Sequence, residues 1–155
     1  MQPDYLPAHI IFVELALSEK RYADALANTR QLQVLDPDQG IGHKLEGDVY
    51  SAQQDYHRAV LAYQNAYSKT PSAQIALFLS NAQYQAEQPE KALSTLQQWL
   101  AVEPTDTTVR IRLAMLLDQL GHRNDAIAEY EQLIEQNPKN DIALNNLAWI
   151  YGTGN

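Results

Sequence analysis

The chain lacks cysteine and is poor in basic residues. None of its 155 residues is Cys, which excludes disulfides, cysteine-ligated zinc and a thiol nucleophile. The 11 Lys and Arg residues are outnumbered by 19 Asp and Glu residues, so the formal net charge is −8. Binding to a phosphate backbone requires a surplus of positive charge. The composition therefore argues against a nucleic-acid-binding protein.

Long apolar runs are also missing. No stretch approaches the 18 or so uninterrupted apolar residues of a membrane span, so no membrane insertion is expected. Residues 1–17 lack the basic start of a secretory signal, and His9 and Glu14 interrupt their apolar stretch. The apolar fraction of 45% is typical of a folded protein.

The chain does contain a repeat. Four alanines recur at intervals of 34, 33 and 34 residues, and four prolines keep the same three intervals. Each alanine precedes its proline by 12 residues. Two residue types with one period indicate an array of repeated units. The alanines are Ala25, Ala59, Ala92 and Ala126, and the prolines are Pro37, Pro71, Pro104 and Pro138.

Each unit has the apolar spacing of two successive helices. Asp55 is expected to cap a helix, Pro89 to lie in a first turn, and Gly121 to follow a helix end, with Arg123 or Asn124 opening the next helix. No segment has the alternation of a strand. Helices are predicted over residues 7–19, 22–35, 40–53, 56–69, 73–86, 89–102, 107–120, 123–136 and 141–151.

Small residues recur inside these helices. Gly47, Ser80, Ala114 and Ala148 occupy matching positions in the first helix of successive units, and the alanine series occupies the second helix. Small side chains at both positions would allow neighbouring backbones to approach closely, while larger residues beside them fill the gaps. We therefore expect both series to be buried.

These features resemble the tetratricopeptide repeat (TPR) family, whose unit is a 34-residue helix–turn–helix. The repeat at residues 40–72 carries this pattern, with Gly47, Tyr50, Tyr56, Ala59, Tyr63, Ala66 and Pro71. The resemblance implies an all-α, right-handed superhelical solenoid of antiparallel helix pairs. The repeats would span residues 6–39, 40–72, 73–106 and 107–140, followed by an unpaired helix at 141–151, all in a single domain of residues 1–155.

The two ends of the sequence suggest a piece of a longer array. The last helix has no partner, and the first helix is apolar around most of its surface, whereas terminal repeats usually present a polar face. The Gln-rich composition and the final NNLAWIY resemble bacterial TPR proteins, including TPR lipoproteins of envelope and PEP-CTERM sorting systems. That resemblance would imply a periplasmic or outer-membrane location; a cytoplasmic one is the alternative.

No pattern in the sequence supports catalysis. The four histidines match no metal-binding spacing, and the segment from Asp36 lacks the residues of a calcium loop. No glycine-rich segment is followed by the Gly-Lys-Ser/Thr of a phosphate loop. We therefore expect no enzyme, no metal and no cofactor.

Binding is the stronger hypothesis, because the TPR resemblance places side chains of the first helices on an inner, partner-binding surface. Asn81 is the candidate with the most specific expected role, since its side-chain amide could form hydrogen bonds with both the N–H and the C=O of a partner's backbone. The alternative for Leu77, Ile111 and Met115 is a place in the core. The candidate partner-binding residues are Lys44, Asp48, Leu77, Asn81, Tyr84, Ile111, Arg112, Met115, Asp118, Asn145 and Trp149.

Some TPR domains hold a C-terminal carboxylate with a set of Lys, Asn and Arg side chains. Lys44, Asn81 and Arg112 match that set, but Asp48 and Thr108 do not, and Asp48 would repel a carboxylate. An acidic rim would instead favour a basic or neutral segment of a partner protein. The alternatives are a structural spacer, self-association through the apolar terminal helices, or regulation of an enzymatic domain outside this chain.

Overall fold

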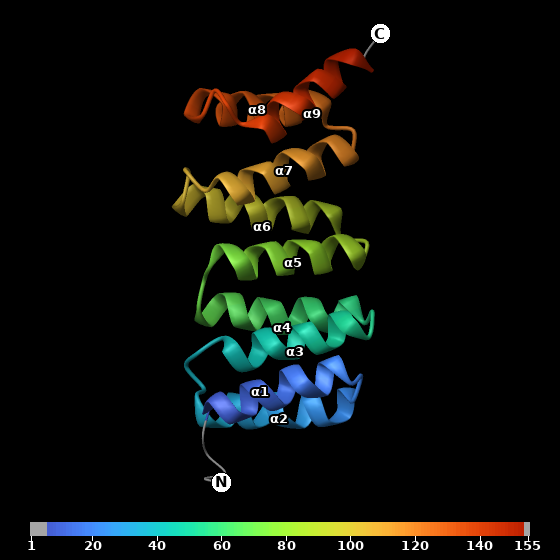
Figure 1. The fold of residues 1–155 in the computed structure, drawn as a ribbon, viewed down its shortest axis with the longest axis vertical. Helices are drawn as coiled ribbons and strands as arrows, with labels where there is room; N and C mark the ends of the chain where they lie inside the picture. The colour runs from blue at the N-terminus through green and yellow to red at the C-terminus, as the bar shows by residue number, and fades with distance from the viewer. Residues whose placement is uncertain (1–5, 154–155) are drawn as a thin grey trace. The chain divides into compact units, whose positions relative to one another are not determined.

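The computed structural model describes residues 6–153, and within that range it contains nine helices and no strand. Figure 1 shows the chain as successive helices joined by short turns. The helices are α1 (Leu6–Ser18), α2 (Tyr22–Leu35), α3 (Ile41–Ala52), α4 (Tyr56–Lys69), α5 (Ala73–Gln85), α6 (Pro89–Val102), α7 (Thr107–Gln119), α8 (Arg123–Gln136) and α9 (Asp141–Gly152).

The predicted helices are confirmed, and their ends agree to within one residue. The four second helices, α2, α4, α6 and α8, match their predicted bounds at both ends. Local signals at the helix ends explain this agreement for α4, α6 and α8. Asp55 accepts a hydrogen bond from the backbone N–H of Arg58 at 3.1 Å, and Pro89 is the first residue of α6. Gly121, at φ 81°, follows the end of α7, and Arg123 opens α8.

The described helices form two compact units, residues 6–88 with α1 to α5 and residues 89–153 with α6 to α9. Within each unit every helix packs against the next one along the chain, and α1 also contacts α3. Consecutive helices within a unit run in opposite directions (Figure 1). The predicted all-α architecture of antiparallel helices is therefore confirmed.

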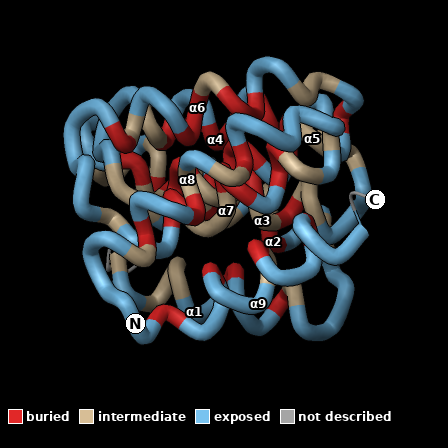
Figure 2. Tube along the Cα trace, turned by 90° about the horizontal axis from the view of Figure 1, so that it is seen from above, coloured by how far each residue is buried: buried red, intermediate tan, exposed pale blue. Residues whose placement is uncertain are grey.

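The predicted small-residue core is confirmed with one exception. The four repeat alanines are fully buried, and Gly47, Ser80 and Ala114 are buried as well. Figure 2 shows such buried positions along the helices, while the turns are largely exposed. Ala148, predicted to be buried, is exposed. It lies on α9, which packs closely against α8 within the second unit but has no described helix after it.

Candidate binding surface on the first helices of the repeats

The predicted partner-binding residues all lie on the first helices of the repeats. We call them the first-helix surface and describe it separately in each unit. In the first unit it comprises Lys44 and Asp48 of α3 and Leu77, Asn81 and Tyr84 of α5. In the second unit it comprises Ile111, Arg112, Met115 and Asp118 of α7 and Asn145 and Trp149 of α9.

Lys44 and Asp48 form an ion pair on α3, with 2.7 Å between Lys44 Nζ and a carboxylate oxygen of Asp48. The other oxygen of Asp48 accepts a hydrogen bond from the Tyr63 hydroxyl at 2.8 Å. Lys44 Nζ also lies 5.1 Å from the centre of the Phe78 ring. Both charges are thus satisfied within the protein. A partner's carboxylate would have to compete with Asp48 for Lys44, which supports the expectation that this surface is not a carboxylate clamp.

Tyr63 links this ion pair to the core. Its ring stacks on Phe78, with 5.7 Å between the ring centres, and its side chain is almost fully buried. Burial raises the pKa of Tyr63 well above its ordinary value, and the negative charge of Asp48 raises it further. The phenol therefore stays neutral, and its hydroxyl donates a hydrogen bond to Asp48.

Sequence reasoning placed Lys44 and Asp48 but missed that they neutralise each other. The signal was present, because residues four apart on a helix lie on the same face and can form an ion pair. No sequence pattern indicates that Phe78 contacts this ion pair. Its contacts with Lys44 and Tyr63 join three different helices, and only the packing brings these side chains together.

Helix α5 supplies uncommitted polar groups. Asn81 is exposed, and among the described residues its side-chain amide has no hydrogen-bond partner. Leu77 and Tyr84, one turn on either side, are half-buried. A cavity of about 220 Å³ lies beside Lys44, where the starts of α3 and α5 meet, and Ile41 and Ile75 contribute its apolar wall. This part of the surface thus combines a free amide with apolar side chains.

The second unit presents a different mixture on α7. Ile111 and Arg112 are half-buried, and Arg112 has no ion pair among the described residues. Met115 is 38% exposed, so neither it nor the half-buried Ile111 and Leu77 is enclosed in the core. Burial raises the pKa of Tyr130 to about 12, and the nearby negative charge of Asp118 contributes.

Helix α9 and the buried side of α7 complete the second unit. Asn145 is exposed, and Trp149 is 68% exposed. Arg110, which sequence reasoning did not single out, is buried and forms an ion pair with Glu129. It also donates a hydrogen bond to Gln132 at 2.6 Å. Because Glu129 and Gln132 lie on α8, and its third partner is the carbonyl of Pro104 before α7, Arg110 holds α7 and α8 together and is not part of the first-helix surface.

Nothing in residues 6–153 has the geometry of a metal site. That range holds no group of three or more His, Asp or Glu side chains able to bind a metal ion. Of the four histidines, His57 and His122 are exposed, and His9 shares a hydrogen bond of 2.9 Å with Asn28. His43 lies 3.6 Å from Glu46. None of the helices described is long and apolar enough to cross a membrane.

Solved structures of TPR proteins are similar to the chain in fold. YrrB, described as a TPR protein with an unusual peptide-binding site, is 24% identical with a TM-score of 0.70, over 97% of this chain and 78% of that one. MamA is 17% identical with a TM-score of 0.74, over 95% of this chain and 81% of that one. Identities this low establish the fold alone.

A third structure contains a ligand. The first TPR of Spaghetti (RPAP3), bound to the HSP90 peptide SRMEEVD, is 22% identical with a TM-score of 0.62 and covers 74% of this chain and 91% of that one. No curated protein sequence matches the chain significantly. The family model for the tetratricopeptide repeat matches residues 50–109 and again 84–150, which together make up more than half of the chain. The repeat, the antiparallel helix pairs and this match lead to one conclusion: the chain belongs to the tetratricopeptide repeat family.

Proposed function

We propose that the chain is a non-enzymatic scaffold whose first-helix surface binds a peptide or helix of a partner protein. TPR proteins generally mediate protein–protein or peptide binding. The observation that best supports this site is the exposed amide of Asn81, which has no partner in the described residues and lies between half-buried Leu77 and Tyr84. A free amide flanked by apolar side chains suits the backbone and side chains of a protein segment.

Electrostatics narrow the kind of partner. Lys44 is already paired with Asp48, so the first unit offers little attraction for a carboxylate on this surface. Arg112 of the second unit has no acidic partner among the described residues. The net charge of −8 favours a neutral or basic segment over an acidic C-terminus, with the backbone of that segment held by Asn81 and with Arg112 donating to its carbonyl oxygens. We propose further that the four repeats and the final helix act as one domain of residues 1–155.

The relatives support a peptide as the partner. The description of YrrB names a peptide-binding site, and the TPR of Spaghetti (RPAP3) was solved with the HSP90 peptide SRMEEVD. Both structures have the fold of this chain, and both descriptions concern peptides.

The test begins with affinity capture of partners from the source organism's extract. The dissociation constant of a captured partner is then measured by calorimetry for the wild type and for Asn81→Ala and Arg112→Ala. Each variant should weaken binding by about tenfold, equivalent to ~1.4 kcal/mol. Exposed residues on second helices supply matched controls, Asn124→Ala and Arg30→Ala, and these should leave binding unchanged. Equal binding by all variants would move the site off the first-helix surface.

Self-association is a second candidate function, because both terminal helices expose apolar side chains. Ile11 of α1 is 60% exposed, and Phe12 and Leu15 beside it are exposed as well. Trp149 and Ile142 are exposed on α9. Apolar groups gathered on one face often mark an interface. Light scattering over a concentration series tests this, and a strict monomer at the highest concentration would remove the candidate.

A further inference from the structure

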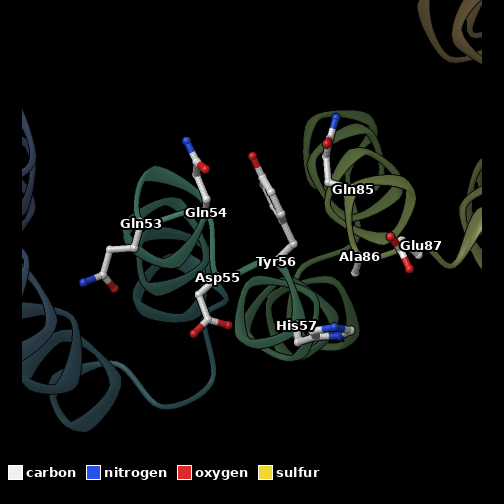
Figure 3. A pocket seen from close by; sticks show the side chains of 8 residues that line it. All are labelled: Gln53, Gln54, Asp55, Tyr56, His57, Gln85, Ala86 and Glu87. Atoms are coloured by element: carbon white, nitrogen blue, oxygen red, sulfur yellow. The ribbon is translucent and has the colours of Figure 1, made fainter.

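A separate cavity, which we call the turn pocket, lies at the edge of the first unit. Its volume is about 520 Å³, and it forms where the turn between α3 and α4 approaches the end of α5 (Figure 3). It shares no residue with the partner-binding residues predicted above. Its walls consist of Gln53, Gln54, Asp55, Tyr56 and His57 from the turn, and Gln85, Ala86 and Glu87 from the end of α5.

The polar groups around the turn pocket are mostly uncommitted. Among the described residues, the amides of Gln53, Gln54 and Gln85 have no hydrogen-bond partner, and neither has the hydroxyl of Tyr56. The carboxylate of Glu87 has no ion pair in the same range. Gln54 and Gln85 extend to the same side as Tyr56, whereas Gln53 points away from them (Figure 3), so two amide oxygens, a phenol and a carboxylate are available to one ligand.

The charges around the pocket favour a cation. Asp55 is occupied by Arg58, whose Nε donates to its carboxylate at 2.6 Å, and this hydrogen bond lowers the pKa of Asp55. Glu87 has no such compensation, and no Lys or Arg lines the pocket. Helices α3 and α5 both end here with a partial negative charge, and the partial positive charge at the start of α4 is offset by its N-cap carboxylate, Asp55. An incoming positive charge would therefore be stabilised.

The aromatic ring at the pocket is held in place by the core. Tyr56 is half-buried and packs against the cluster that includes Ala59, Ala82 and Ala86. In the view of Figure 3 its side chain extends between those of Gln54 and Gln85, toward the same side. Because the ring is already ordered, a ligand that stacks on it loses little additional conformational freedom.

These features suit a guanidinium better than an ammonium group. A guanidinium is planar, stacks on an aromatic ring, and presents five N–H donors in a fixed fork. The amide oxygens of Gln54 and Gln85 and the carboxylate of Glu87 could accept several of those donors. We propose that the turn pocket binds an arginine side chain of a partner protein segment, independently of the first-helix surface.

The first experiment titrates the ¹⁵N-labelled chain with two blocked tripeptides that differ only in charge: N-acetyl-Gly-Arg-Gly amide and its citrulline counterpart. The arginine peptide should shift the amide resonances of residues 53–57 and 85–87 and bind roughly fivefold or more tightly than the citrulline peptide. Equal binding of the two peptides would overturn the proposal. So would shifts confined to other residues, or no shifts at all.

The second experiment uses a pair of charge-neutralising variants. Glu87→Gln removes the unpaired carboxylate. The substitution should not strain the turn, because another glutamine of this chain, Gln54, has the same left-handed backbone conformation as Glu87, with φ 60° at both positions. Glu135→Gln, on an exposed face of α8, makes the same change in net charge away from the pocket. Glu87→Gln should weaken the arginine peptide by roughly threefold, as expected for an exposed ion pair, and Glu135→Gln should not. Equal weakening by both variants would mean that only net charge matters, which would overturn the proposal.

Discussion

At the scale of single residues, Gly47 makes the sharpest prediction. A Cβ atom added there would lie 2.5 Å from two ring carbons of Tyr63. That ring cannot easily move, because it stacks on Phe78 and its hydroxyl donates to Asp48. Alanine normally stabilises a helix by about 1 kcal/mol relative to glycine. Here the overlap should dominate, and Gly47→Ala should lower the free energy of unfolding by about 1–3 kcal/mol, measured by urea denaturation.

Gly152 provides the matched control for this substitution. It is also helical, at the end of α9, but a Cβ there would meet no atom within 4 Å. Gly152→Ala should therefore be neutral or slightly stabilising. If Gly47→Ala changed the free energy of unfolding no more than Gly152→Ala does, that result would contradict the close packing of Gly47 against the Tyr63 ring.

At the scale of elements, the turns that follow α1, α3, α5 and α7 share one backbone feature. Each contains a residue in the left-handed conformation: Lys20 at φ 57°, Gln54 at 60°, Glu87 at 60° and Gly121 at 81°. Only the last is glycine, the residue that adopts this conformation without steric cost. Lys20→Gly should therefore raise the free energy of unfolding by about 0.5–1 kcal/mol, measured as a higher denaturation midpoint.

The same substitution inside a helix should have the opposite sign. Lys91 is exposed in the first turn of α6 and has right-handed helical geometry. Lys91→Gly should destabilise the protein, because glycine loses more conformational freedom on folding. A loss of stability in both variants would show that the turn at Lys20 does not need the left-handed conformation.

The elements also show how far sequence reasoning reaches. Period, caps and prolines predicted the helices to within a residue, since those signals act locally, as at Asp55 and Pro89. Local signals could not predict that a polar residue such as Gln54 would adopt the left-handed conformation. They also predicted a buried Ala148, which is exposed, because the burial of a residue depends on a helix packed over it and no described helix follows α9. The same limit applies to the first-helix surface, where sequence located Lys44 without the ring of Phe78 that it contacts.

At the scale of the whole molecule, buried phenols predict loss of stability in alkaline solution. Burial raises the pKa of Tyr63 and Tyr67 in the first unit and brings that of Tyr130 in the second to about 12, against an ordinary value of 10.0. A raised phenol pKa means that the folded state favours the neutral form. The resulting stabilisation is complete below pH 10 and declines as the pH rises through the folded-state pKa, about 12 for Tyr130. Urea denaturation at a series of pH values should show this decline.

A second cause of alkaline unfolding must be separated from the first. The chain already has a net charge of −8, so every tyrosinate formed adds self-repulsion wherever it lies. Self-repulsion depends on the number of charges, whereas the burial effect depends on which phenol ionises. Tyr130→Phe should therefore flatten the decline between pH 10 and 12, while Tyr151→Phe, at an exposed position on α9, should change it little. Equal flattening in the two variants would attribute alkaline unfolding to net charge and would contradict a specific role for buried Tyr130.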